Sequence, residues 1–126
     1  MRQLIFVALG VMAFGAIAGA TQATFHVPGE PGTALTSVEA RDHIGHRVTV
    51  EGVVSEVHFA ERATFIDLDG RYPNEQFTGV IFRGDDFAFP DVGVLQGRRV
   101  AITGTVQLYR GRPEIVLRSA DQVRSE

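Results

Sequence analysis

The fold is decided by the stretch Gly45-His46-Arg47-Val48-Thr49-Val50-Glu51-Gly52-Val53-Val54, which returns as Gly97-Arg98-Arg99-Val100-Ala101-Ile102-Thr103-Gly104-Thr105-Val106. The two copies share both glycines, the arginine at the third position and three apolar positions. Apolar residues alternate along each copy, as is typical of a strand with one buried face. A glycine inside a strand is typical of a bulge or a sharp bend. The repeat therefore predicts two long, bent strands of a small closed barrel.

A further strand is expected soon after the first copy of the repeat. Apolar and other residues alternate along the segment 65–68. This alternation predicts that Ile66 and Leu68 face the core, while Phe65 and Asp67 face outward.

The segment 77–82 is the next expected strand, and its run Val80-Ile81-Phe82 is apolar on both faces. Either a helix covers the outer side of this strand or that side receives a ligand. Turn formers are dense in 69–74, which predicts a loop before this strand. The last expected strand, 113–117, follows Tyr109-Arg110-Gly111, whose glycine favours a tight hairpin after the second copy of the repeat.

Helical signals flank these strands. Thr36 and Glu39 have the spacing of a capping box, which predicts a helix that Gly45 ends. The connection 84–97 is expected to form a short helix or helical turn over one end of the barrel. Beyond Ser119 we expect a short polar tail.

Residues 1–20 have the pattern of a secretory signal peptide. Arg2 precedes an apolar run over 4–17, which is short for a membrane span, and small residues allow cleavage after Ala18 or Ala20. An uncleaved anchor is the alternative. The pattern predicts a periplasmic or secreted protein that meets the membrane only transiently, through its signal peptide.

Residues 21–35 contain two Pro-Gly pairs and no periodic pattern, so they are expected to form a flexible linker. The remaining segment, 36–126, predicts a single domain with one modest core. The chain has no cysteine, which excludes disulfides, and its net charge is −3 at pH 7. This acidic balance argues against a nonspecific binder of polyanions.

The order and spacing of these segments resemble the nucleic-acid-binding OB domains related to tRNA-anticodon-binding modules and to the N-terminal domain of the exonuclease VII large subunit. The resemblance implies an all-β fold, a five-stranded OB-fold Greek-key barrel with an N-terminal helix and a short helical cap between its third and fourth strands. It spans about 40–117 and is carried by 48–54, 65–68, 80–82, 97–106 and 109–117.

The resemblance implies that the protein binds single-stranded nucleic acid or oligonucleotides across the second and third strands and the last hairpin. Aromatic faces stack on bases, and guanidinium groups hold phosphates. Asp67 and Asp69 lie on or beside this face, where they would repel phosphate. Carried over position by position, the candidate residues are Phe65, Arg71, Tyr72, Thr78, Val80, Phe82, Arg83, Tyr109, Arg110 and Arg112.

A different class of function also fits the acidic sequence. Asp67 and Asp69 favour it as well. Without a nucleic-acid role, Phe65 and Phe82 pack beneath a cap or the N-terminal helix, and Arg110 and Arg112 serve solubility. The protein is then a periplasmic accessory or stress module that binds a protein, a peptide or a small cation.

The sequence offers no catalytic constellation. His43 and His46 are separated by the helix-ending Gly45, which argues against a shared metal site. The run Asp67-Leu68-Asp69-Gly70 lacks the remaining ligands of a calcium loop. Thermonuclease-type OB barrels use acid motifs that have no counterpart here. We therefore expect a binding protein that is not an enzyme and uses neither metal nor cofactor.

Overall fold

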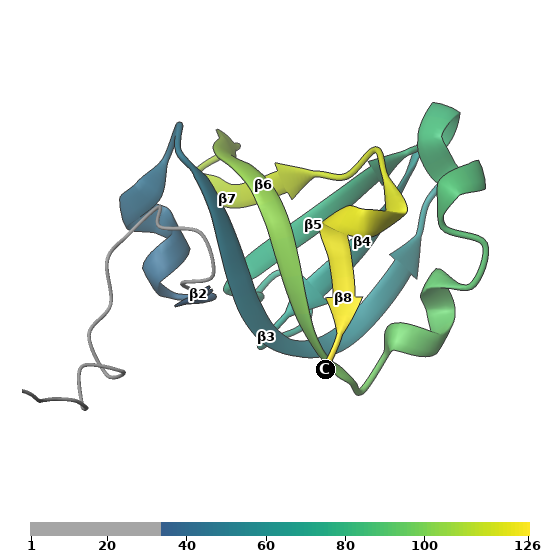
Figure 1. The fold of residues 1–126 in the computed structure, drawn as a ribbon, viewed down its shortest axis with the longest axis horizontal. Coiled ribbons are helices and arrows are strands. Elements are labelled where there is room, and N and C mark those ends of the chain that lie inside the picture. Colours follow the sequence, from purple (N-terminus) through teal and green to yellow (C-terminus); the bar gives the residue numbers. More distant parts are fainter. Residues whose placement is uncertain (1–33) are drawn as a thin grey trace, which may run out of the picture.

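The computed structural model describes residues 34–126, which form a small β-barrel with short 3₁₀ helices at its two ends (Figure 1). The predicted signal peptide and residues 21–33 of the predicted linker lie outside the described residues. The described part begins with strand β2 (Ala34–Thr36), which pairs in parallel with the next strand.

Five strands close the barrel, as the sequence predicts. Each strand pairs antiparallel with its barrel neighbours, except for the parallel pair β5 and β7. Contact between β3 and β6 completes the ring in the order β3, β4, β5, β7, β6. The strands are β3 (Arg47–Phe59), β4 (Ala63–Leu68), β5 (Phe77–Phe82), β6 (Arg99–Tyr109) and β7 (Arg112–Val116).

The two copies of the sequence repeat pair with each other as β3 and β6, from Arg47 opposite Thr105 to Val53 opposite Arg99. An equivalent backbone hydrogen bond joins the first residue of each copy to the last residue of the other copy. The amide of Gly45 donates to the carbonyl of Val106 (2.7 Å), and the amide of Gly97 donates to that of Val54 (2.8 Å). Both of these glycines have a left-handed backbone, with φ of +87° and +86°. The repeat is therefore structural: its two copies pair as antiparallel strands with equivalent ends, related by a local two-fold axis.

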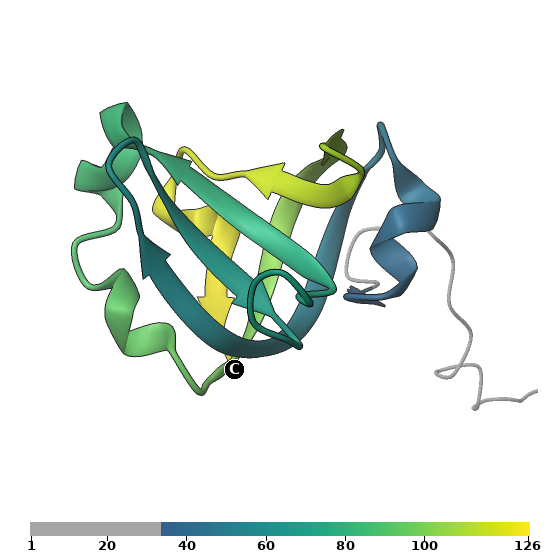
Figure 2. The same cartoon turned by 180° about the vertical axis from the view of Figure 1, so that it is seen from behind.

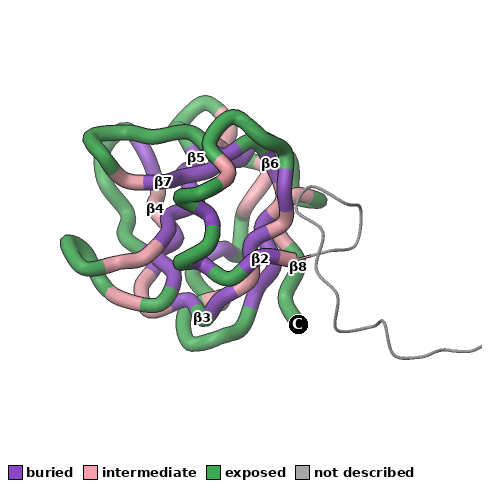
Figure 3. The backbone as a smooth tube through the Cα atoms, turned by 90° about the vertical axis from the view of Figure 1, so that its left-hand side faces the viewer, coloured by how far each residue is buried: buried purple, intermediate pink, exposed green. Residues whose placement is uncertain are grey.

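The barrel interior is filled by the alternating apolar residues of every strand, as Figure 3 shows by the buried stretches along β4, β5 and β7. Ile66 and Leu68 are fully buried, as predicted from their alternation. The register of β3 against β4 shifts between Val54 and Glu56, so the bulge lies near the middle of β3 and not at its glycine.

The two predicted helical regions are present as short 3₁₀ helices. Helix η3 (Glu39–His43) follows a capping box in which the Glu39 carboxylate accepts from the Thr36 amide (2.9 Å). It is shorter than predicted because β2 extends to Thr36 and Gly45 ends the turn. Helices η4 (Arg83–Ala88) and η5 (Val92–Leu95) cap the far end of the barrel, where Val92 is buried in the core. Within residues 34–126, no helix is long and apolar enough to cross a membrane.

The prediction of a polar tail beyond Ser119 is wrong, because this segment is ordered and pairs with the barrel. Helix η6 (Ala120–Gln122) leads into strand β8 (Val123–Ser125), which pairs with β6. The Gln122 amide group donates to the carbonyls of Thr103 (3.0 Å) and Val116 (3.2 Å), so one polar side chain ties the terminus to two strands. This use of a polar residue is why the local composition suggested a tail.

Gln122→Ala is expected to lower the free energy of unfolding by about 2 kcal/mol, because it removes several partly buried hydrogen bonds at once. Urea unfolding measures the change. Arg124→Ala, on the exposed side of β8, is the control and should change stability by less than about 0.5 kcal/mol. Equal stability of the two variants would contradict the structural role of Gln122.

Candidate functional site

A row of polar side chains crosses the outer face of the barrel. Asp67 on β4 lies opposite Glu56 on β3 and Thr78 on β5, and Thr78 lies opposite Glu114 on β7. Gln107 on β6 faces Glu114 and completes the row. Two hydrogen bonds link its members, from Thr78 Oγ1 to Asp67 Oδ1 (3.1 Å) and from Gln107 Nε2 to Glu114 Oε2 (2.7 Å). The middle of this row, formed by Asp67, Thr78 and Glu114, is the floor of a pocket.

The pocket has a volume of about 410 Å³ and lies where β4, β5 and β7 run side by side, the arrangement seen from behind in Figure 2. That volume is within the range of small-molecule sites. Its walls come from the end of β3, the loop 69–76, the β6–β7 hairpin and β7. The lining residues are His58, Phe65, Asp67, Tyr72, Glu75, Thr78, Tyr109, Arg110, Arg112, Pro113 and Glu114.

Arg112 fixes one wall of the pocket. Its guanidinium donates to Glu75 Oε2 (2.5 Å) and lies over the Tyr72 ring, 4.8 Å from the ring centroid. Both partners belong to the loop 69–76, so this single side chain joins the loop to β7. Gly70 lets the loop fold back tightly, because a Cβ there would lie 2.5 Å from the carbonyl oxygen of Asn74.

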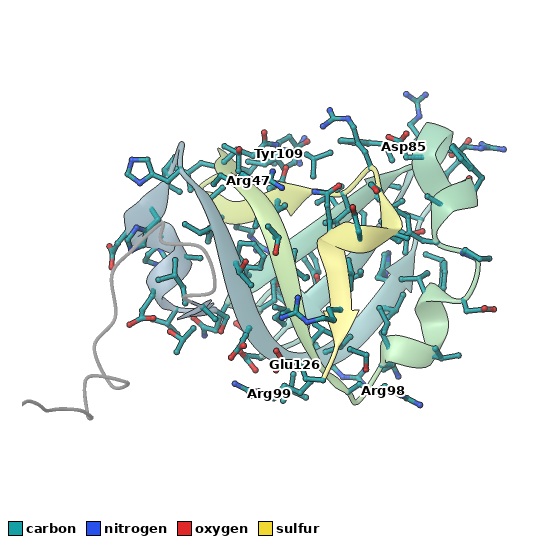
Figure 4. All side chains as sticks on the ribbon, viewed as in Figure 1. Arg47, Asp85, Arg98, Arg99, Tyr109 and Glu126 are labelled. Carbon is teal, nitrogen blue, oxygen red and sulfur yellow. The ribbon has the colours of Figure 1, made fainter. Side chains whose placement is uncertain are left out.

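The β6–β7 hairpin forms the opposite rim. Arg110 and Gly111 both have positive φ, at 53° and 79°, which is the geometry of a two-residue hairpin turn. The turn holds the Arg110 guanidinium 5.2 Å from the centroid of the Tyr109 ring, and both side chains are exposed. Figure 4 shows Tyr109 at one edge of the barrel and Arg98 at the opposite edge.

The floor carboxyls sit in a weakly solvated environment. Burial raises the pKa of Asp67 from 3.8 to about 6, against the opposing effect of the Thr78 hydrogen bond. The charges of Glu75 and Glu56 raise it further, and His58 lowers it. Burial also raises the pKa of Glu114, which the Gln107 hydrogen bond opposes. Asp67 is therefore an ionised acceptor at neutral pH and neutral in mild acid.

One acceptor of the pocket has no hydrogen-bond partner. The Glu75 side chain is only 5% exposed, and although Oε2 receives the Arg112 bond, Oε1 is buried without a donor. A buried carboxylate oxygen without a donor costs free energy.

The structure brings six of the ten predicted binding residues together in the pocket: Phe65, Tyr72, Thr78, Tyr109, Arg110 and Arg112. Val80 lies beside Phe65 on the same face, is buried and does not line the pocket. The other three, Arg71, Phe82 and Arg83, are exposed and outside it. Phe82 and Arg83 lie where β5 ends and η4 begins, beyond the reach of the pocket.

Sequence reasoning missed the acidic floor as part of the site. Asp67 lies on the outer face as predicted and lines the pocket, yet it is only 3% exposed. Asp69 does not face the pocket, because its carboxylate accepts from the Ser37 hydroxyl and from the Val53 amide (3.0 Å). Glu114 could have been found, since alternation along β7 puts it on the same face as Arg112.

Residues 34–126 contain no group of three or more His, Cys, Asp or Glu side chains arranged to hold a metal ion.

The strand order and the pocket on the outer face define an OB-fold protein. No protein-family model and no curated protein match the sequence. Solved structures do match: OBody AM1L10 bound to hen egg-white lysozyme is 20% identical with a TM-score of 0.58, over 77% of this chain and 96% of that one. OBody AM3L09 bound to the same protein is 19% identical with a TM-score of 0.55, over 76% of this chain and 96% of that one.

A third similar structure is described as an aspartyl-tRNA synthetase from Leishmania major Friedlin. It is 13% identical with a TM-score of 0.54, over 86% of this chain and 23% of the synthetase chain. This chain therefore corresponds to less than a quarter of that enzyme. At these identities the likeness shows the OB fold alone.

Proposed function

We propose that the protein is an exported OB-fold binding module for single-stranded nucleic acid or oligonucleotides, with no catalytic activity of its own. The observation that carries the proposal is the convergence of Phe65, Tyr72 and Tyr109 with two guanidinium groups around one pocket. Aromatic faces stack on bases of any sequence, and arginines hold the phosphates between them. The apolar run in residues 4–17 supports the export part of the proposal.

The rim and the floor suit different parts of a nucleotide. Arg110 is exposed at the tip of the hairpin, where a phosphate could reach it from solvent. The acids Asp67, Glu75 and Glu114 line the same pocket but are nearly buried. The synthetase among the similar structures has a name that mentions tRNA, which agrees with this class of ligand.

A second candidate function is the binding of a cationic group of a protein or peptide. The acidic floor favours it, and two similar structures are OBodies bound to a protein. Against it, Arg112 already supplies the cation that pairs with Glu75 and lies over Tyr72.

The test is the binding of fluorescent single-stranded DNA at increasing salt, read by anisotropy. We expect the affinity to fall as salt rises, with a log–log slope of about −0.7 for each phosphate held. Arg110→Gln should make the slope shallower by about 0.7, and Tyr109→Ala should weaken binding about tenfold or more through lost stacking.

Matched controls separate the site from the general charge of the protein. Arg98→Gln removes the same charge at the opposite edge, and Phe87→Ala removes an aromatic ring from the exposed surface of η4. Neither should change the affinity or the slope. The proposal fails if no single strand binds at low salt, or if the control variants lose as much affinity as the pocket variants.

A further inference from the structure

We propose that the two arginines of the pocket have different roles in strand binding. Arg110 holds a phosphate, whereas Arg112 is a positioning residue that fixes the Tyr72 ring as a stacking platform for a base. The inference rests on the proposed function and divides it between the two guanidinium groups. It also gives a role to Glu75, the acid that pairs with Arg112.

The two guanidinium groups differ in their charged partners. Arg112 donates to Glu75 Oε2 at 2.5 Å, and the Glu75 side chain is only 5% exposed. If Arg112 turned to a phosphate, this nearly buried carboxylate would lose its cation, which is strongly unfavourable. Arg110 is exposed and has no ion-pair partner within residues 34–126. The charge of Arg110 is therefore available to a phosphate, and the charge of Arg112 is already neutralised.

The Tyr72 ring is covered on one side and open elsewhere. The guanidinium carbon of Arg112 lies 4.8 Å from the ring centroid, which is the distance of a cation–π contact. Tyr72 is nevertheless 70% exposed, and it lines the pocket. The planar guanidinium thus supports the ring from one side, and the remaining surface is accessible to a base.

This support matters because Tyr72 belongs to the loop 69–76 and not to a strand. Arg112 lies on β7 and contacts two members of the loop, Tyr72 and Glu75. A side chain that is held in place before binding loses less conformational freedom when the ligand arrives. Arg112 therefore strengthens stacking on Tyr72 without touching the ligand itself.

The test replaces the ion pair by two neutral side chains, in the double variant Glu75→Gln/Arg112→Gln. One acid and one base are removed, so the net charge and the general attraction of the protein to DNA are unchanged. Binding of a fluorescent oligothymidine strand is measured at several salt concentrations. We expect the affinity to fall about tenfold, as it should in Tyr72→Ala, through weakened stacking. The log–log salt slope should stay at the wild-type value, because no phosphate contact is lost.

Adding the double variant to Tyr72→Ala separates positioning from a general structural effect. If Arg112 acts through Tyr72, the three changes together should bind within about twofold of Tyr72→Ala alone. A general disturbance of the pocket would weaken binding in both backgrounds.

Arg112→Lys tests the same role with the charge retained. Lysine can still pair with Glu75 and can hold a phosphate as a point charge, but it lacks the planar group that lies flat on a ring. We expect this variant to lose affinity several-fold, again with the wild-type slope. Circular dichroism confirms that the variants fold.

A matched control makes the same neutral change at an ion pair outside the pocket. Arg99 pairs with Glu51 at 3.5 Å, and neither residue lines the pocket. Glu51→Gln/Arg99→Gln should keep the wild-type affinity and slope.

The outcomes separate this inference from the proposed function. A slope that becomes shallower by about 0.7 in Glu75→Gln/Arg112→Gln would show that Arg112 holds a phosphate, which overturns the positioning role and leaves single-strand binding in place. Full affinity of that variant or of Arg112→Lys, or a further large loss in the Tyr72→Ala background, also overturns it. If the wild-type protein binds no strand, both proposals fall together.

Discussion

Replacing Gly52 and Gly104 together by valine is expected to prevent folding. A Cβ at Gly104 would lie 2.4 Å from Ile115 Cγ2, and Ile115 is fully buried and cannot move aside. A Cβ at Gly52 would lie 2.6 Å from Asp69 Oδ2. Each overpacked site costs about 1 to 3 kcal/mol or more, so the two changes together cost about 2 to 6 kcal/mol or more, which is comparable with the roughly 5 kcal/mol at the lower end of small-domain stabilities.

Thermal unfolding followed by circular dichroism measures this effect. Gly84→Val is the matched control, because a Cβ at that position meets nothing within 4 Å and its φ is not positive. It should unfold close to the wild-type temperature. A double variant of normal stability would show that β3 and β6 do not approach their neighbours as closely as described.

Much of the barrel could be predicted because its signals are local. The repeat, the alternation along β4 and the Arg110-Gly111 turn each depend on neighbouring residues, and each is confirmed. The chain end could not be predicted in this way. Its order depends on the bonds of Gln122 to Thr103 and Val116, which are partners on two different strands.

The candidate site likewise has one part that local sequence signals predict and one part that depends on distant contacts. Tyr109 and Arg110 follow from a hairpin motif, and the structure places both in the pocket. The acidic floor depends on the loop 69–76, which Arg112 holds through Glu75 across 37 residues of sequence. No local pattern encodes a contact over that distance. For this reason Asp67 was expected to oppose binding, whereas the structure places it at the bottom of the pocket.

The buried Asp67 makes the protein less stable at neutral pH than it would be without this charge. Folding raises the pKa of this carboxyl from 3.8 to about 6, so between these values the folded protein retains a proton that the unfolded chain has released. Stability therefore falls as the pH rises through this window, and the loss is complete above about pH 6. The pKa change corresponds to about 2 to 3 kcal/mol. A charge kept at such a cost is typical of a functional site.

Asp67→Asn is therefore expected to stabilise the protein by about 2 to 3 kcal/mol at neutral pH and to have almost no effect in acid, below the ordinary pKa. The amide oxygen can still accept from Thr78, and asparagine does not ionise. Urea unfolding of both proteins over a range of pH measures the difference, in which the contribution of Glu114 cancels. Asp91→Asn, an exposed control, should show no such dependence. A stability difference that is constant with pH would contradict the raised pKa. A variant that gains stability at neutral pH and loses single-strand binding would show that the chain retains this acid for its ligand.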